Sequence, residues 1–284
     1  GLHWIDVISE IAFVIMDLQH RRLNTLAYRF LNRYLSHTSD YAGLALLPYY
    51  SVYRALVRCK VALLRWQQHQ KPEDLHEART YANLAESYRQ QKTPGLFITH
   101  GFSGSGKSTL STQVADNLGI IHLRSDIERK RLPQPRTHHA GPEAGENEVN
   151  RGRYAPENVL LVYRRLAELA DAILSAGYSV LIDAAFLQAA QRQLFTDLAF
   201  KRRLKLTILD FYAPAPVLRK RICERRQAGH DASEATLAVL EHQLESAQAL
   251  SKNEIEHTIR IDSCDKNALQ ALLLDVRLQA ASRS

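Results

Sequence analysis

The feature that most constrains this chain is an eight-residue pattern that follows a short apolar run. Residues 96–100 read LFITH, and residues 101–108 read GFSGSGKS, which fits GxxxxGK[ST]. A loop of this kind needs a strand before it and a helix after it. Leu110, Val114 and Leu118 supply the apolar stripe of such a helix. The pattern therefore predicts a strand, a glycine-rich loop and a helix in immediate succession.

The chemistry expected of this loop is phosphate binding. Its glycines let backbone N–H groups converge on phosphate oxygens, and the N-terminus of the following helix adds partial positive charge. We expect Lys107 to reach the β- and γ-phosphates of a nucleotide and Ser108 to ligate Mg²⁺. The alternative is a turn of glycine and serine that binds no ligand. The residues expected to bind the nucleotide are Gly101, Ser103, Gly104, Ser105, Gly106, Lys107, Ser108 and Thr109.

Short apolar runs bounded by turns recur after residue 95 and alternate with helical stretches. Beyond 96–100 they occupy residues 120–123, 179–183, 206–211 and 257–262. Strands that alternate with helices form parallel sheets covered on both faces. The sequence thus predicts an α/β fold with a five-stranded parallel sheet and helices on both faces.

The first ninety or so residues have a different pattern, because every periodic segment in them is helical. Apolar residues recur at steps of three and four over 4–18 and 23–35, and two further segments begin at Pro48 and Pro72. A polar stretch that ends in Pro-Gly follows at 90–95. We therefore predict an all-α helical module over residues 1–92 and an α/β domain over residues 93–284.

Composition excludes a disordered, collagen-like or low-complexity chain. The chain of 284 residues is 45% hydrophobic and 24% charged, as in ordinary folded proteins. No apolar run approaches the ~18 residues of a membrane span, and no secretory signal is visible. Three isolated cysteines lack metal-ligand spacing, so we expect a cytoplasmic protein without a membrane partner. The net charge of +7 is spread over both halves and does not by itself indicate nucleic acid.

A second carboxylate is expected near the loop, because phosphate-loop proteins hold Mg²⁺ or its waters with an acidic residue at the end of a neighbouring strand. Asp183, which closes the run SVLID, is the favoured candidate. Asp210 is the rival, because it also lies late in an apolar run. Either residue could instead cap the following helix.

Asp126 and Arg129 follow the second predicted strand in the segment LRSDIERKR. Their spacing of three places them on one face of a helix, at the carboxyl edge of the sheet where ligands bind. A carboxylate there can accept a proton from an attacking hydroxyl, and a neighbouring arginine keeps it ionised. The alternative is an N-cap aspartate with a surface arginine, and both descriptions can hold together.

Arg221 and Arg225 lie four residues apart in VLRKRICERR. Like charges at this spacing cost helix stability unless an anion lies between them, and a triphosphate would serve. The alternative is a solvated basic face that Glu224 partly neutralises.

The phosphate loop, the SDxxR element, the VLIDAAF segment and the late arginine pair together resemble the P-loop kinase family of polynucleotide 5′-hydroxyl kinases, gluconate-type kinases and zeta-toxin-like kinases. The resemblance covers residues 95–265 and implies a P-loop kinase-type sheet. It also implies that Asp126 is the general base, that Arg129 orients the acceptor, and that Arg221 and Arg225 close on the phosphates from a lid helix. Arg192 is implied, more weakly, to face the site.

Residues 1–90 carry a second resemblance, to the closing helices of an aminoglycoside-phosphotransferase-like domain in bacterial proteins that fuse such a domain to a P-loop kinase. It is carried by WIDVISEIAFVIMDL, RFLNRYLSHTSDYAGLALLPYY and YRALVRCKVALLR. No HxDxxxxN element of that fold occurs in these residues. The chain therefore looks like the end of a longer protein, or a truncated form of one, in which this module is a scaffold.

The function expected from these residues is an ATP- and Mg²⁺-dependent kinase that transfers the γ-phosphoryl group to a hydroxyl. The acceptor is a small molecule, a nucleotide or a nucleic-acid end, and the basic segment 133–153, predicted to be a loop, is expected to frame it. Two alternatives stay open: an NTPase switch that drives a partner, and a nucleotide-sensing module without turnover. The sequence does not determine the oligomeric state.

Overall fold

The fold is built on one twisted parallel sheet. The computed structural model describes residues 5–90, 93–132, 156–228 and 236–281. Five strands pair in the order β2-β3-β1-β4-β5, all parallel, as the sequence predicts. The strands are β1 (Leu96–His100), β2 (Ile121–Arg124), β3 (Val180–Asp183), β4 (Leu206–Tyr212) and β5 (Thr258–Asp262).

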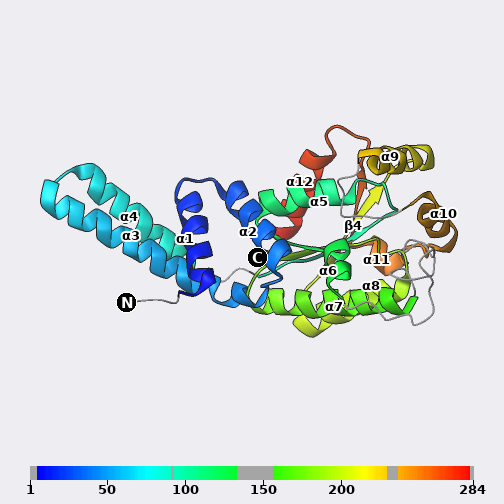
Figure 1. Ribbon diagram of the computed structural model, residues 1–284, viewed down its shortest axis with the longest axis horizontal. Coiled ribbons are helices and arrows are strands. Elements are labelled where there is room, and N and C mark those ends of the chain that lie inside the picture. Colours follow the sequence, from blue (N-terminus) through cyan, green and yellow to red (C-terminus); the bar gives the residue numbers. More distant parts are fainter. Residues whose placement is uncertain (1–4, 91–92, 133–155, 229–235, 282–284) are drawn as a thin grey trace, which may run out of the picture.

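Alternation along the strands divides the core between the two faces of the sheet. Phe97 packs in one cluster, which also contains residues of α5 (Lys107–Leu118) and α12 (Ala268–Ala281). Leu96 and Ile98 pack in the other, against α7 (Pro156–Ser175) and α8 (Ala189–Arg202). Successive side chains of a strand point to opposite faces, so each apolar run supplies both layers. Figure 1 shows these helices on the two sides of the sheet.

Further helices of the α/β part follow β2 or β4, or precede β5. They are α6 (Ser125–Arg131), α9 (Ala215–Ala228), α10 (Leu237–Ser246) and α11 (Lys252–Ile255). The segment 133–153, expected to be a loop, lies outside the described residues. In the part of the chain that the structure describes, no helix has both the length and the apolar character needed to cross a bilayer.

The N-terminal residues form the helices that their periodicity predicts. They are α1 (Val7–His20), α2 (Asn24–Thr38), the short 3₁₀ helix η1 (Ala42–Ala45), α3 (Leu47–His69) and α4 (Pro72–Ser87). In Figure 1, α3 and α4 form a hairpin that extends away from the sheet. Met16 and Tyr81 belong to a small core between this hairpin and α1. We keep the name helical module for residues 1–92.

The helical module shares a core with the sheet. Ile8, Leu31 and Leu44 belong to the same buried cluster as Leu96 and Ile121. Helix α2 packs on α5 and on the edge strand β2, and η1 packs on α7. The boundary predicted at residue 92 stays a prediction, and residues 91–92 lie outside the described part. What the structure adds is that α1, α2 and η1 are packed into the α/β core.

Candidate functional site

A cavity of about 920 Å³ lies at the carboxyl ends of β1, β2 and β3, the edge where ligands bind in open α/β sheets. Residues of the glycine-rich loop, α6, α7, α8, α9 and α10 line it. The predicted site residues among the lining are Ser103, Gly104, Gly106, Lys107, Ser108, Thr109, Asp126, Arg129, Asp183, Arg221 and Arg225. Gly101 and Ser105 are buried at the base of the loop and are not in that lining.

Two glycines of the loop are required by its backbone path. Gly101 has φ 138° and Gly104 has φ 84°, a region that side chains rarely adopt. A Cβ at Gly101 would collide with the carbonyl of Phe211, and one at Gly104 would lie 2.8 Å from the carbonyl of Leu218. The loop therefore passes against β4 and α9 with no room for side chains there.

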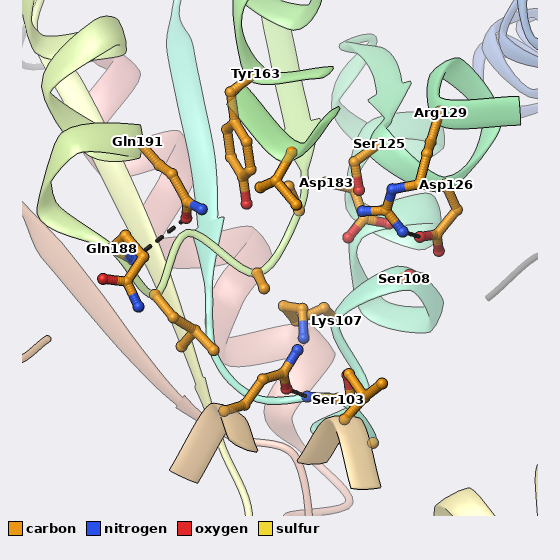
Figure 2. A pocket seen from close by; sticks show the side chains of 18 of the residues that line it. Ser103, Lys107, Ser108, Ser125, Asp126, Arg129, Tyr163, Asp183, Gln188 and Gln191 are labelled. Atoms are coloured by element: carbon orange, nitrogen blue, oxygen red, sulfur yellow. Dashed lines mark hydrogen bonds and ion pairs between the residues drawn. The ribbon is translucent and has the colours of Figure 1, made fainter. Parts of the chain in front are cut away.

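Lys107 lies in the floor of the cavity. Its Nζ donates to the carbonyl oxygens of Gly101 at 2.9 Å and Phe102 at 2.6 Å. Burial lowers the pKa of the ammonium to about 8, although the nearby carboxylates of Asp183 and Asp126 act to raise it. A buried cation with two acidic neighbours is suited to receive a polyanion. Figure 2 shows Lys107 between the α6 side of the cavity and the α8 side.

Asp183 lies at the end of β3, beside Ser108. Its Oδ2 is 3.4 Å from Nε2 of His122 and 3.8 Å from Nε of Arg124. Burial acts to raise the pKa of Asp183, but interactions with His122, Ser108 and Arg124 outweigh it and hold the pKa below its ordinary value. Asp183 is therefore ionised at neutral pH.

The pair of Ser108 and Asp183 fits a magnesium ion. Asp183 Oδ2 is buried, and among the described residues it has no hydrogen-bond partner. Oxygen ligands from a hydroxyl and a carboxylate are those that Mg²⁺ prefers. Asp210, the rival candidate, forms a hydrogen bond through Oδ1 with Nδ1 of His100 at 2.7 Å. It is not among the described residues that line the cavity.

Asp126 lies in the first turn of α6 and faces the cavity. Its carboxylate oxygens are 3.7 Å from Nη1 of Arg129 and 3.9 Å from Nη2 of Arg124. Burial raises the pKa of Asp126, and the three cations Arg129, Arg124 and Lys107 only partly offset this effect. The N-cap of α6 is Arg124, so the alternative of Asp126 as an N-cap is wrong.

The two arginines of α9 have different surroundings. Arg221 donates to the carbonyl of Gly104 at 3.2 Å and to the hydroxyl of Ser263 at 2.9 Å, which ties α9 to the glycine-rich loop and to the end of β5. Arg225 lines the cavity, and its charge acts to lower the pKa of Lys107.

Arg192 does not face the cavity, which corrects the weaker of the implied site residues. It is 1% exposed, and its Nε lies 2.5 Å from Oε1 of Glu254. Its Nη atoms donate to the carbonyls of Phe186, Gln248 and Ala249. Arg192 therefore ties the loop after β3 to the segment after α10. The resemblance misplaced it because burial by these long-range partners leaves no local signal.

Replacing Arg192 with methionine should lower the free energy of unfolding by about 3 kcal/mol, because Glu254 and three carbonyls lose their shared partner. Urea denaturation measures the change. Arg165→Met is the matched control, since its ion pair with Glu168 is exposed and such pairs contribute about 0–1 kcal/mol. Equal small losses in both variants would contradict this role of Arg192.

Several residues that line the cavity or bond to its lining were not predicted from the sequence. Arg124 is the last residue of β2, and Ser263 directly follows β5. The rule that ligands bind at the carboxyl edge of a parallel sheet could have identified both. Gln243 accepts from the backbone N–H of Ser103 at 2.9 Å, and the Tyr163 hydroxyl accepts from the N–H of Phe186 at 3.1 Å. Those two contacts join distant segments, and no motif marks them.

The fold and the loop define a protein of the α/β class with a glycine-rich loop that joins a strand of a parallel sheet to a helix. The family described as AAA domain matches residues 96–250, more than half of the chain. The chain belongs to this family.

The chain is also similar to other proteins in sequence and to solved structures in fold. Uncharacterized proteins of Mycobacterium tuberculosis and Mycobacterium bovis are 31% identical over 240 residues, or 84% of this chain and 47% of theirs. The chain thus spans about half the length of these relatives. A putative kinase from Chloroflexus aurantiacus has the same fold, with a TM-score of 0.50 and 20% identity over 69% of this chain and 100% of its own. A sugar kinase from Janibacter sp. aligns with 23% identity and a TM-score of 0.46, covering 66% and 95%.

Proposed function

We propose that this chain transfers the γ-phosphoryl group of ATP to a hydroxyl group of an acceptor. The observation that carries the proposal is that one cavity holds two carboxylates with opposite properties. The pKa of Asp183, beside Ser108, is lowered, whereas the pKa of Asp126, on α6, is raised by burial. A metal-holding carboxylate must stay ionised, and a general base works best with a pKa closer to the working pH. The two environments therefore support two roles.

Each residue has a distinct part in the proposed reaction. The amides of the glycine-rich loop and the Lys107 ammonium would hold the β- and γ-phosphates and neutralise their charge. Asp126 would take the proton of the acceptor hydroxyl as it attacks the γ-phosphorus, and Arg129 would orient the acceptor beside it. The buried surroundings of Asp126 support this part, because a desolvated carboxylate is a stronger base.

Mg²⁺ would be held by Ser108 and, directly or through water, by Asp183. When bound, it neutralises charge on the phosphates. The carboxylate needs an ionised state for this task, and its lowered pKa supports that state.

Two other functions are compatible with a phosphate-binding loop: an NTPase switch and a nucleotide sensor. Measuring ADP release from ATP across a panel of hydroxyl compounds, including sugars, nucleosides and 5′-hydroxyl oligonucleotides, separates the three. We expect release that depends on one class of acceptor. Release that no acceptor alters would support the switch, and nucleotide binding without release would support the sensor.

Replacing Arg225 with alanine should lower kcat by the order of 10²-fold and change the affinity for ADP much less. A cation beside the phosphates stabilises most strongly the charge that develops in the transition state. Steady-state kinetics and ADP titration measure the two effects. Arg219→Ala is the matched control on the same helix, because Arg219 pairs with Glu241 at 2.8 Å outside the cavity lining. Equal kinetics for both variants would remove Arg225 from the mechanism.

The finer proposals concern the rest of the protein. The resemblance of residues 1–92 to the end of an aminoglycoside-phosphotransferase-like domain supports a fusion with such a domain. The proposed acceptor is a small hydroxyl compound, a nucleotide or a nucleic-acid end.

A further inference from the structure

Helix α6 is short, and it carries both residues proposed to handle the acceptor. Over seven residues it presents Asp126 and Arg129 to the cavity. Glu128 lies two residues from Asp126, which is about 200° around the helix, and it is only 2% exposed. A buried carboxylate must be paired or hydrogen-bonded. What binds Glu128 therefore determines how α6 is seated.

The partners of Glu128 come from its own helix and from the helical module. Tyr41, between α2 and η1, is 3% exposed, and its hydroxyl donates to Glu128 Oε1 at 3.4 Å. Arg131, at the end of α6, pairs with the same oxygen. The other nitrogen of Arg131 donates to the carbonyl of Ser36 in α2. Two side chains on the back of α6 are thus bonded to residues 36–41.

The Glu128 carboxylate accepts from the Tyr41 hydroxyl and pairs with the Arg131 guanidinium. Burial raises the pKa of the Tyr41 phenol, and the neighbouring Glu128 charge adds to the rise. The phenol therefore keeps its proton and acts as the donor at all ordinary pH values. Because Arg131 belongs to α6 itself, the bonds that restrict the position of α6 against the module are those from Tyr41 to Glu128 and from Arg131 to Ser36.

The strand before α6 is also held by the module. Asn32 of α2 donates from Nδ2 to the carbonyl of Ile120 at 3.1 Å and accepts from the N–H of His122 at 2.9 Å. Because β2 is one of the two edge strands of the described sheet, its outer backbone groups have no strand partner on that side, and the Asn32 amide supplies one. Strand β2 and α6 are therefore both fixed from the same side.

We propose that residues 24–46 of the helical module hold α6 in its working position, and that Tyr41 and Glu128 are positioning residues for phosphoryl transfer. The proposal rests on the proposed function of Asp126 and Arg129 for its catalytic part. The module is then more than a scaffold, because its contacts place the helix that carries the acceptor-side groups.

The test compares Tyr41→Phe with Tyr34→Phe in the full chain. Both changes remove one phenolic hydroxyl of the module that donates to a carboxylate, but Tyr34 donates to Asp40 at 2.9 Å within the module itself. Loss of a hydrogen bond costs about fivefold in a local equilibrium. Amide hydrogen exchange over residues 125–131 should therefore be about fivefold faster in Tyr41→Phe and unchanged in Tyr34→Phe.

Kinetics provide the second measurement. Because small displacements of reacting groups cost up to ~10²-fold in rate, Tyr41→Phe should lower acceptor-dependent kcat about tenfold, with the dissociation constant of ATP unchanged. Glu128→Gln should have a similar effect, and the double variant should be no slower than the slower single one, since both remove the same link.

Each outcome decides between the two proposals. Unchanged exchange in α6, or faster exchange with unchanged kcat, would overturn the positioning proposal. Equal effects of the Tyr34 and Tyr41 changes would overturn it as well. If no hydroxyl compound supports turnover, the proposed function fails, and the exchange measurement still decides whether the module holds α6.

Discussion

The Lys107→Ala protein should show no measurable phosphoryl transfer and a weakened affinity for ATP. The change removes the cation at the floor of the cavity, whose Nζ is held by the carbonyls of Gly101 and Phe102. Its charge is the one the loop directs at the β- and γ-phosphates.

Isothermal titration with ATP and an assay of ADP release measure the two effects. Lys60→Ala is the matched control, because Lys60 is exposed on α3, far along the chain from the loop. Normal turnover of the Lys107 variant would overturn the whole functional proposal. In the wild-type protein, burial lowers the pKa of Lys107 to about 8. The cation is therefore present below that pH, and affinity for ATP should fall as the pH rises through it.

The Asp126→Asn protein should fold normally and bind ATP with wild-type affinity, yet lose ~10²–10⁴-fold in kcat, as is typical when a general base is removed. The amide keeps the size of the side chain but cannot take a proton. Because the structure excludes an N-cap role for Asp126, no capping bond of α6 is lost. A change in thermal stability of only a few degrees is expected.

Turnover should be measured at saturating ATP and Mg²⁺, so that a weakened metal site is not mistaken for a lost base. Asp275→Asn, an exposed change on α12, is the control. Because burial raises the pKa of Asp126, kcat of the wild-type protein should fall on acidification at a higher pH than an ordinary aspartate would cause. A variant that keeps wild-type turnover would remove Asp126 from the mechanism.

The order and type of the elements could be predicted from local patterns. The predicted strands at 96–100, 179–183 and 257–262 each lie within one residue of β1, β3 and β5. Apolar runs and turn residues act over a few positions, so they leave a readable signal. The glycine-rich loop could also be predicted from the sequence, because its backbone has positive φ at Gly104 and Gly106, where glycine is favoured.

The contacts between distant segments could not be predicted in this way. Tyr41 and Glu128 are 87 residues apart in sequence, and Arg192 and Glu254 are 62 apart. Each pair consists of ordinary polar residues that would be expected on a surface. Packing of the module against the sheet buries the first pair, and packing of α8 against the segment after α10 buries the second. The residues of each pair become partners through this packing.

The sequence by itself therefore determined the sheet, the glycine-rich loop and the residue types at the strand ends, since these depend on short-range periodicity and backbone conformation. The tertiary structure alone decided which carboxylate lies beside Ser108, that Arg192 is internal, and that the module bonds to α6. These depend on desolvation and on directional bonds between segments, which exist only when the chain is packed.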